Sequence, residues 1–199
     1  MSKPLPQSFY NRSSDLVARD LLGKIFVRQI GAGFIKGKVV ETEAYLASGD
    51  EASHNFKGKN ERNQSLYKDA GHAYVHSMRQ YFLLDLVTED VDTPSSVLIR
   101  AIEPTEGIEH MKEFRGTDIV KNLANGPSKF CIAFGIDKEF DGVDVTNSKS
   151  PFYVTEPEIL DIHIDIEISG RIGISRAKDA PLRFWVKGNQ FISKKGLVS

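Results

Sequence analysis

The segment VVETEAYL, residues 39–46, places two glutamates inside a run of residues that favour β-strands. Valine, threonine and tyrosine are all enriched in strands, so this segment is predicted to be one. Because side chains two positions apart in a regular strand share a face, Val39, Glu41, Glu43 and Tyr45 are expected to point the same way. A carboxylate in an apolar strand is costly unless it is paired or hydrated, so at least one glutamate is expected to have a partner.

The segment VLIRAIEP, residues 97–104, provides a candidate for that partner. Arg100 lies in this second apolar, strand-like run and has the same need for a counter-charge. Two interpretations are compatible with the pair: a buried Glu–Arg ion pair that stiffens a sheet, or a catalytic carboxylate held by an arginine. The local pattern alone does not distinguish between them.

Predicted strands and helices intermix along the chain without the spacing of repeated βαβ units. We therefore predict one α+β domain over residues 1–199, with a mainly antiparallel β-sheet and flanking helices. Helices are predicted over residues 13–24, 105–116 and 125–136. Strands are predicted over residues 24–30, 34–46, 72–88, 95–104, 161–168 and 181–193.

Three details of these elements follow from their residues. Thr105 is expected to cap the second helix. The strict alternation of DIHIDIEI, residues 161–168, predicts that its isoleucines form a buried face. These isoleucines are Ile162, Ile164, Ile166 and Ile168. The segment PLRFWVKGNQFIS, residues 181–193, is predicted to form a closing hairpin around Gly188.

The composition is typical of one soluble domain, because 40% of the 199 residues are hydrophobic and 27% are charged. No apolar run approaches the length of a membrane span, and the N-terminal MSKPLPQSFY lacks the apolar core of a secretory signal. The lone Cys131 excludes an internal disulfide and fits a reducing, cytoplasmic setting. The five histidines and single cysteine lack the spacing of a zinc site, so no metal is expected.

The formal net charge of −1 indicates that any surface for nucleic acid must be local, because proteins that depend on phosphate contacts usually carry a basic excess. Charges do cluster: residues 56–68 are basic and residues 156–167 are acidic. The alternative explanation is two solvated segments on opposite sides of the protein. The segment GPSK, residues 126–129, is either a plain helix start or a place where backbone N–H groups hold a phosphate.

The longer segment VVETEAYLASGDEASHNFKGKNERN, residues 39–63, is similar to the signature segment of the alkyladenine (3-methyladenine) DNA glycosylases. Further motifs match that family in the same order along nearly the whole chain. They are AGHAYV (70–75), VLIRAIEP (97–104), NGPSK (125–129), RIGIS (171–175) and PLRFWVKG (181–188). The resemblance implies the family's fold, including a protruding β-hairpin. It also implies the family's activity, which is to flip a damaged purine out of duplex DNA and hydrolyse its N-glycosidic bond with water.

The resemblance assigns three catalytic positions. The acidic residue that activates the water falls on Glu43, and the arginine that helps to hold this water falls on Arg100. Ile172 matches the residue whose backbone carbonyl contacts the water. Arg100 is expected to keep Glu43 ionised, and the neighbouring Glu41 is then expected to be structural.

Four further positions match residues that hold the flipped base. Tyr45 matches the tyrosine on one face of the base, and His54 matches the histidine on the other face. His76 stands where the family commonly has a second stacking tyrosine. Asp85 stands in place of an asparagine that helps to reject guanine through its 2-amino group, so we expect weaker exclusion of guanine or better excision of alkylguanines.

The hairpin that follows is expected to enter the minor groove and fill the gap left by the flipped base. Its tip is one residue shorter than in the mammalian type, which leaves Met78 or Arg79 as the wedge. An apolar wedge favours Met78, and Arg79 then suits a phosphate or groove contact. Other phosphate contacts are expected from the local basic residues, with modest and salt-sensitive affinity. These are Lys57, Lys59, Arg62 and Lys129.

The resulting hypothesis is a monofunctional, monomeric DNA glycosylase that removes 3-methyladenine, 7-methylguanine and hypoxanthine from double-stranded DNA. It implies no metal, organic cofactor or membrane, and it suggests a bacterial-type cytoplasm in which the protein associates with the nucleoid. Two alternatives remain open. One is a non-catalytic module that binds damaged DNA, and the other is a nucleoside hydrolase that works through Glu41 and Glu43.

Overall fold

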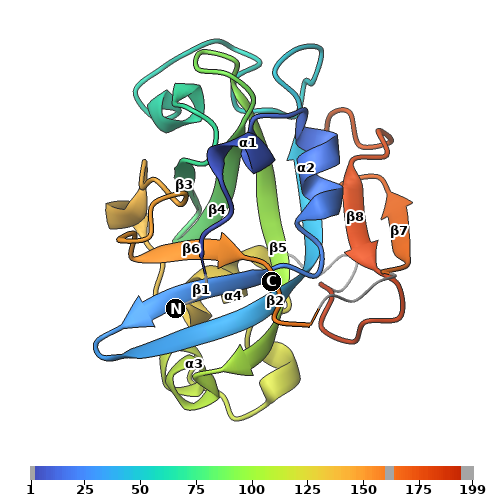
Figure 1. Ribbon diagram of the computed structural model, residues 1–199. Coiled ribbons are helices and arrows are strands. Elements are labelled where there is room, and N and C mark those ends of the chain that lie inside the picture. Colours follow the sequence, from blue (N-terminus) through green and yellow to red (C-terminus); the bar gives the residue numbers. More distant parts are fainter. Residues whose placement is uncertain (1–2, 160–163, 194–199) are drawn as a thin grey trace.

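The computed structural model of the protein describes residues 3–159 and 164–193. These residues form a curled sheet with the strand order β3-β4-β5-β2-β1-β6, in which β8 pairs with both β2 and β7 (Figure 1). Every pairing between these strands is antiparallel. The predicted α+β class with a mainly antiparallel sheet is therefore confirmed. The strands are β1 Ile25–Ile30, β2 Gly33–Tyr45, β3 Ala73–Met78, β4 Tyr81–Thr88, β5 Ser95–Glu106, β6 Phe152–Thr155, β7 Ile166–Ser169 and β8 Arg183–Val186.

Short helices cover this sheet. Helix α2 packs against β2 and β5, whereas α4 packs against β4, β5 and α3. Within the described residues, none of the helices is both long and apolar enough to cross a membrane. The α-helices are α1 Gln7–Tyr10, α2 Ser14–Asp20, α3 Ile108–Arg115 and α4 Pro127–Ala133. The 3-10 helices are η1 Gln64–Tyr67, η2 Val120–Asn122 and η3 Lys138–Phe140.

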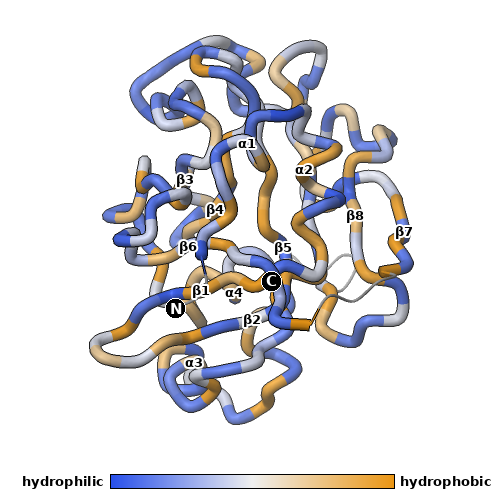
Figure 2. Tube along the Cα trace, in the orientation of Figure 1, coloured by the Kyte–Doolittle hydropathy of each residue, from blue (hydrophilic) through white to orange (hydrophobic). Residues whose placement is uncertain are grey.

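Aromatic side chains fill the core between the sheet and α4. The ring of Phe26 on β1 lies 5.0 Å from that of Phe130 and 5.4 Å from that of Phe134, in edge-on contacts, and 5.5 Å from that of Phe152. Cys131 is buried within the same hydrophobic cluster. Figure 2 shows hydrophobic residues along the central strands and mostly hydrophilic residues in the loops at the top of the view. Burying each large apolar side chain stabilises the fold by roughly 1.5–3 kcal/mol.

Strand β2 organises the sheet because it is paired along both edges. One edge pairs with β5, and the other is shared between β1, opposite residues 33–38, and β8, opposite residues 41–43. The register with β5 shifts on both sides of Glu41. Such irregularities break the two-residue alternation of a regular strand. The common face predicted for Val39 and Glu41 assumed that alternation, which does not hold at this point of β2.

The carboxylate of Glu41 joins three segments of the chain. Its Oε1 accepts hydrogen bonds from Nε of Arg100 on β5 at 2.9 Å and from Nε of Arg183 on β8 at 2.7 Å. The same oxygen accepts from Oγ of Ser193 at 2.7 Å, and Oε2 accepts from the Ser193 backbone N–H. Burial raises the pKa of Glu41, but the two guanidinium groups and Ser193 outweigh it, so the pKa lies below its ordinary value. These contacts agree with the structural role expected for Glu41.

The helix cap predicted at Thr105 is wrong. Strand β5 continues through Thr105 to Glu106, and α3 begins only after Gly107. Gly107 has a φ of 72°, and a Cβ atom there would lie 2.6 Å from the carbonyl oxygen of Phe34. A glycine is therefore needed where the chain turns from strand to helix.

Two predictions near the C-terminus are also wrong. Ile168 on β7 is 42% exposed rather than buried, because β7 is an edge strand that pairs only with β8 among the described strands. Ile162 lies outside the described residues, and Ile164 and Ile166 are half-buried. The hairpin predicted around Gly188 does not form, since β2 and β7 already occupy both edges of β8. The chain instead turns at Gly188, where φ is 73°, and brings Ser193 to Glu41.

The contacts of Glu41 lead to a prediction about stability. Replacing Glu41 by alanine leaves two buried guanidinium groups without their shared carboxylate, so the free energy of unfolding should fall by about 3–5 kcal/mol. Urea denaturation measures this change. The control is Glu109→Ala, which removes a carboxylate that is 82% exposed and that, among the described residues, pairs with Lys112, and it should change stability by less than about 0.5 kcal/mol. Equal effects of the two substitutions would contradict the structural role of Glu41.

Candidate active site

A cavity of about 910 Å³ opens beside β3, β4 and β5. Its wall combines residues from these strands, the end of β2, the start of α4 and the segment 172–174. Nine of the residues singled out in the sequence line this one cavity. They are Tyr45, His54, His76, Met78, Arg79, Asp85, Arg100, Lys129 and Ile172.

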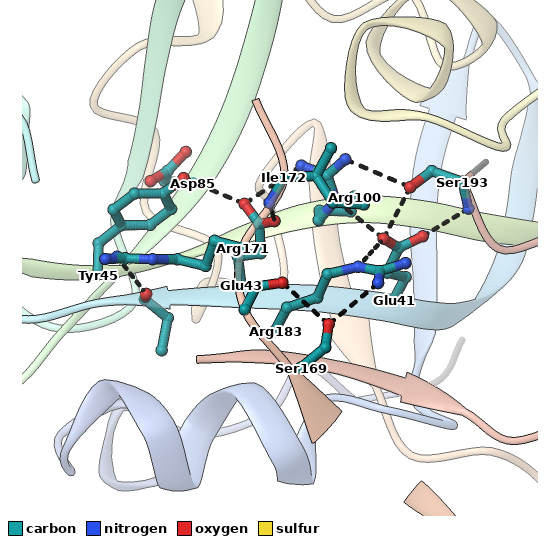
Figure 3. A network of polar contacts seen from close by, with 12 residues as sticks. Glu41, Glu43, Tyr45, Asp85, Arg100, Ser169, Arg171, Ile172, Arg183 and Ser193 are labelled. Atoms are coloured by element: carbon teal, nitrogen blue, oxygen red, sulfur yellow. Dashed lines mark hydrogen bonds and ion pairs between the residues drawn. The ribbon is translucent and has the colours of Figure 1, made fainter. Parts of the chain in front are cut away.

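Glu43 lies directly behind this wall. Its Oε1 accepts a hydrogen bond from the backbone N–H of Ile172 at 2.7 Å, and its Oε2 accepts one from the hydroxyl of Tyr45 at 3.1 Å. The Nη1 of Arg100 lies 3.2 Å from Oε2 of Glu43, while its Nε binds Glu41 (Figure 3). One arginine therefore bridges the structural carboxylate and the candidate catalytic one.

Burial and charge compete at Glu43. Burial raises the pKa of this carboxyl, and Arg100, the Ile172 N–H and the Tyr45 hydroxyl lower it less than burial raises it. The pKa of Glu43 therefore lies above its ordinary value, although Arg100 was expected to keep the group ionised. Arg100 does lower the pKa, as expected, but the expectation left out the larger effect of burial and the nearby charge of Glu41. A raised pKa is typical of a carboxyl that exchanges protons near its working pH.

Glu43 is itself fully buried, so its contact with the cavity is indirect. Three of its partners, Tyr45, Arg100 and Ile172, form the wall in front of it. A carboxylate oxygen accepts about two hydrogen bonds, and Oε1 accepts only one among the described residues. This oxygen keeps the capacity to bind one water, which reaches it only if the wall in front of it moves.

Three rings form the opposite part of the wall. The hydroxyl of Tyr74 lies 2.9 Å from Nδ1 of His54, and the ring of Tyr74 stacks on that of His76 with centroids 5.0 Å apart. His54 stands edge-on to His76 at 4.5 Å. Burial, followed by the neighbouring His76, lowers the pKa of His54, which favours its neutral form. The sequence pointed to Tyr74 only as part of the matched motif AGHAYV, yet this residue contacts both histidines.

Asp85 lies on the same wall and is 4% exposed. Its Oδ1 is 3.1 Å from Nε2 of His76, and its Oδ2 accepts a hydrogen bond from Oγ of Ser96 at 2.8 Å. The two residues that depart from the family pattern, His76 and Asp85, therefore contact each other. Strand pairing explains this contact because β3 and β4 form one hairpin.

Sequence reasoning missed a second buried ion pair that supports the cavity. Arg171 binds Asp50 through two hydrogen bonds of 2.6 Å and donates a third to the carbonyl of Ala44 at 3.0 Å. Its guanidinium also lies 4.6 Å from the centroid of the Tyr45 ring (Figure 3). Arg171 thus ties the segment that carries Ile172 to the end of β2. The sequence did contain a signal for Arg171. It is a charged residue within the matched motif RIGIS, as Arg100 is within the matched motif VLIRAIEP.

Arg183 and Ser193 were missed as well. Arg183 interrupts the apolar run PLRFWV, residues 181–186, as Arg100 interrupts its own strand, so the burial argument applied to Arg100 could have found it. The contact between Ser193 and Glu41 spans 152 positions in the sequence, and no local pattern indicates it.

The hairpin formed by β3 and β4 ends in an exposed tip at the cavity. Met78 is 41% exposed and pairs with Tyr81 across a turn formed by Arg79 and Gln80. Arg79 has a φ of 57°, in the left-handed region. This arrangement is compatible with either residue as the predicted wedge.

The predicted phosphate contacts fall into two groups. Lys129 lines the cavity, where its Nζ donates a hydrogen bond to Asn125 at 2.9 Å. Lys57, Lys59 and Arg62 are exposed and lie outside the cavity lining. Lys59 pairs with Asp92 at 3.4 Å. In the described ranges, no three histidine, cysteine or acidic side chains gather as a metal site would require.

Comparison with known proteins shows which family the chain resembles. A model described as methylpurine-DNA glycosylase matches residues 8–190. A relative from Clostridium perfringens is 42% identical over 204 residues, which cover 96% of this chain and 99% of the relative. Relatives from Carboxydothermus hydrogenoformans and Bdellovibrio bacteriovorus are 39% and 38% identical, with the same two coverages. All three carry the provisional name 3-methyladenine DNA glycosylase. Because these matches extend over nearly the whole length, the chain belongs to the methylpurine-DNA glycosylase family.

Proposed function

We propose that this protein is a monofunctional DNA glycosylase that binds an extruded, damaged purine in the cavity and hydrolyses its N-glycosidic bond. The observation that carries the proposal is the position of Glu43, which shares Arg100, Tyr45 and Ile172 with the wall of a cavity of about 910 Å³. The names of the relatives support 3-methyladenine as a substrate. Extrusion is required because the bond is not accessible within stacked duplex DNA.

In this proposal Glu43 orients and deprotonates the attacking water. Its Oε1 has the remaining capacity for a hydrogen bond, and the Ile172 N–H holds that oxygen in place. Once ionised, Glu43 also stabilises the positive charge that develops on the sugar as the base departs. Arg100 limits the cost of this ionisation, since it already lies 3.2 Å from Oε2.

The rings of Tyr45, His54 and His76 are proposed to hold the base by stacking. Electron-poor alkylated purines stack well on such rings, and a positively charged base adds a cation–π interaction of roughly 0.5–2 kcal/mol. The guanidinium of Arg171 lies over the Tyr45 ring, but its pairing with Asp50 offsets the charge. Duplex DNA is proposed to meet the hairpin tip, with Met78 as the wedge.

A non-catalytic module that binds damaged DNA is the second candidate function. The complete burial of Glu43 favours it, because water must displace part of the wall before it reaches the carboxylate. Absence of base release under single-turnover conditions, with DNA binding retained, would support this candidate. The two functions therefore differ in one direct measurement.

The first test removes the proposed base. Glu43→Gln should lower the single-turnover rate of base release from alkylated and hypoxanthine-containing duplexes by about 10²–10⁴-fold, the usual contribution of general acid–base catalysis. Glu51→Gln, which changes an exposed glutamate, is the matched control and should retain the wild-type rate. A rate for Glu43→Gln within about threefold of wild type would contradict the proposed role.

The second test concerns the product. The matched water-activating position holds a carboxylate, Glu43, rather than an amine, so the DNA strand should stay intact at the abasic site until it is heated in alkali. Denaturing electrophoresis of the product measures this. Borohydride should trap no covalent complex, although Lys129 places an amine in the cavity wall. Strand cleavage by the pure protein, or a trapped complex that Lys129→Arg abolishes, would contradict a monofunctional mechanism.

The third test uses the pH dependence. Because the ionised form of Glu43 is the active one and burial raises its pKa, the rate should rise with pH around a midpoint above the ordinary glutamate value. Tyr45→Phe removes a hydrogen bond that lowers this pKa, so the midpoint should move to higher pH. Single-turnover rates across the pH range of the folded protein measure the shift. Tyr153→Phe, on β6, is the control with an unchanged midpoint, and a downward shift for Tyr45→Phe would refute the assignment.

A further inference from the structure

If every buried carboxyl and guanidinium group is ionised, the buried charges around the cavity do not balance. Among the described residues, four carboxylates are buried but only three guanidinium groups. The carboxylates belong to Glu41, Glu43, Asp50 and Asp85, and the guanidinium groups to Arg100, Arg171 and Arg183. A buried charge without a counter-charge is costly, so the excess negative charge needs compensation.

The excess charge is located at Asp85. Glu41 pairs with Arg100 and Arg183, Glu43 pairs with Arg100, and Asp50 pairs with Arg171. Among the ion pairs of the described residues, Asp85 has a single partner, Nε2 of His76 at 3.1 Å. This imidazole balances the carboxylate only when it is protonated.

Other cations on the cavity wall are less buried than these groups. Three further cations line the cavity. Arg79 is exposed, whereas Arg115 and Lys129 are half-buried and donate hydrogen bonds to the carbonyl of Leu123 and to Asn125, respectively. Among the ion pairs of the described residues, the one that includes Asp85 is with His76. Partial exposure to water also screens their charge.

Asp85 is placed where a base would meet it. It lines the cavity together with Tyr45 and His76, the rings proposed to stack on the base, and it is 4% exposed. Its oxygens each have one hydrogen-bond partner among the described residues, His76 for Oδ1 and Ser96 for Oδ2, so each has capacity for another donor. A positively charged ligand in this cavity would provide the missing counter-charge.

We infer that Asp85 makes the cavity selective for purines that carry a positive charge, as bases alkylated at N3 or N7 do, over neutral purines such as hypoxanthine. This inference rests on the proposed function, because it assigns the substrate class of the same cavity. A charged alkylpurine completes the charge balance of the buried groups. A neutral base leaves Asp85 dependent on protonation of His76.

Selectivity for charge differs from recognition of the guanine 2-amino group by Asp85. Three bases distinguish these two explanations. The base 7-methylguanine carries both a positive charge and a 2-amino group, whereas 3-methyladenine carries the charge alone. Hypoxanthine carries neither. A charge effect therefore extends to both methylated bases, and a contact with the 2-amino group affects only 7-methylguanine.

The experiment compares wild type with Asp85→Asn, which keeps the shape of the side chain and removes its charge. Single-turnover release of the two methylated bases is measured on DNA treated with dimethyl sulfate, and release of hypoxanthine is measured on a defined duplex. Asp85→Asn should lower the rate of release of both methylated bases, relative to that of hypoxanthine, by about tenfold or more, as expected for the loss of one charge interaction in a buried site. Asp69→Asn, which alters an exposed aspartate outside the cavity lining, should leave all three rates unchanged.

A second variant protects the test against misfolding. His76→Gln removes the protonatable partner of Asp85, so the ratio of 3-methyladenine release to hypoxanthine release should increase. An unchanged or lower ratio in this variant would overturn the inference. Equal slowing of all three bases by Asp85→Asn, or slowing of 7-methylguanine alone, would also overturn it. Failure of the wild-type protein to release any of the bases would instead refute the proposed function.

Discussion

The site depends on one buried guanidinium that serves two carboxylates. Arg100 on β5 donates to Glu41 through Nε and approaches Glu43 through Nη1. Removing two carboxylates from water is costly, and shared arginines offset that cost with strong, directional contacts. Both glutamates lie on β2, which pairs with β5 and β8 at the centre of the sheet. The contacts of Arg100 therefore hold β5 against β2 and keep Glu41 and Glu43 close to the same guanidinium.

Burial has two consequences at Glu43. It makes the charged form expensive and so raises the pKa of the carboxyl, as a proton-transfer role requires. It also places the carboxylate behind the wall of the cavity, so that water reaches it only if that wall is displaced. Tyr45 and Ile172 are part of this wall, and their hydroxyl and N–H groups contact Glu43. Arg171, next to Ile172, contacts the Tyr45 ring and the Ala44 carbonyl and so connects the Ile172 segment to the end of β2. The groups that would bind the base are therefore mechanically linked to those that would cleave it.

Much of the fold could be predicted because its signals are local. The strand predicted over residues 34–46, the helix predicted over residues 125–136 and the antiparallel class all follow from propensity and pattern. The structure has β2 at Gly33–Tyr45, α4 at Pro127–Ala133 and antiparallel pairing. The failures have long-range causes. The predicted hairpin at Gly188 fails because distant strands occupy both edges of β8, and Ile168 is exposed because nothing in the described structure covers the outer strand.

The sequence by itself determined that glutamates and an arginine in apolar strands had to meet, since their charges could not be buried alone. The order of its motifs also determined the family. Only the tertiary structure decided how Arg100 divides its contacts between Glu41 and Glu43, and that Arg183 is the second partner of Glu41. It also revealed that, among the ion pairs of the described residues, the buried Asp85 is paired with a histidine rather than with an arginine. The physical reason is that local patterns indicate which charged groups need partners. Strand pairing, and the path of the chain between distant segments, determine which partners come within reach.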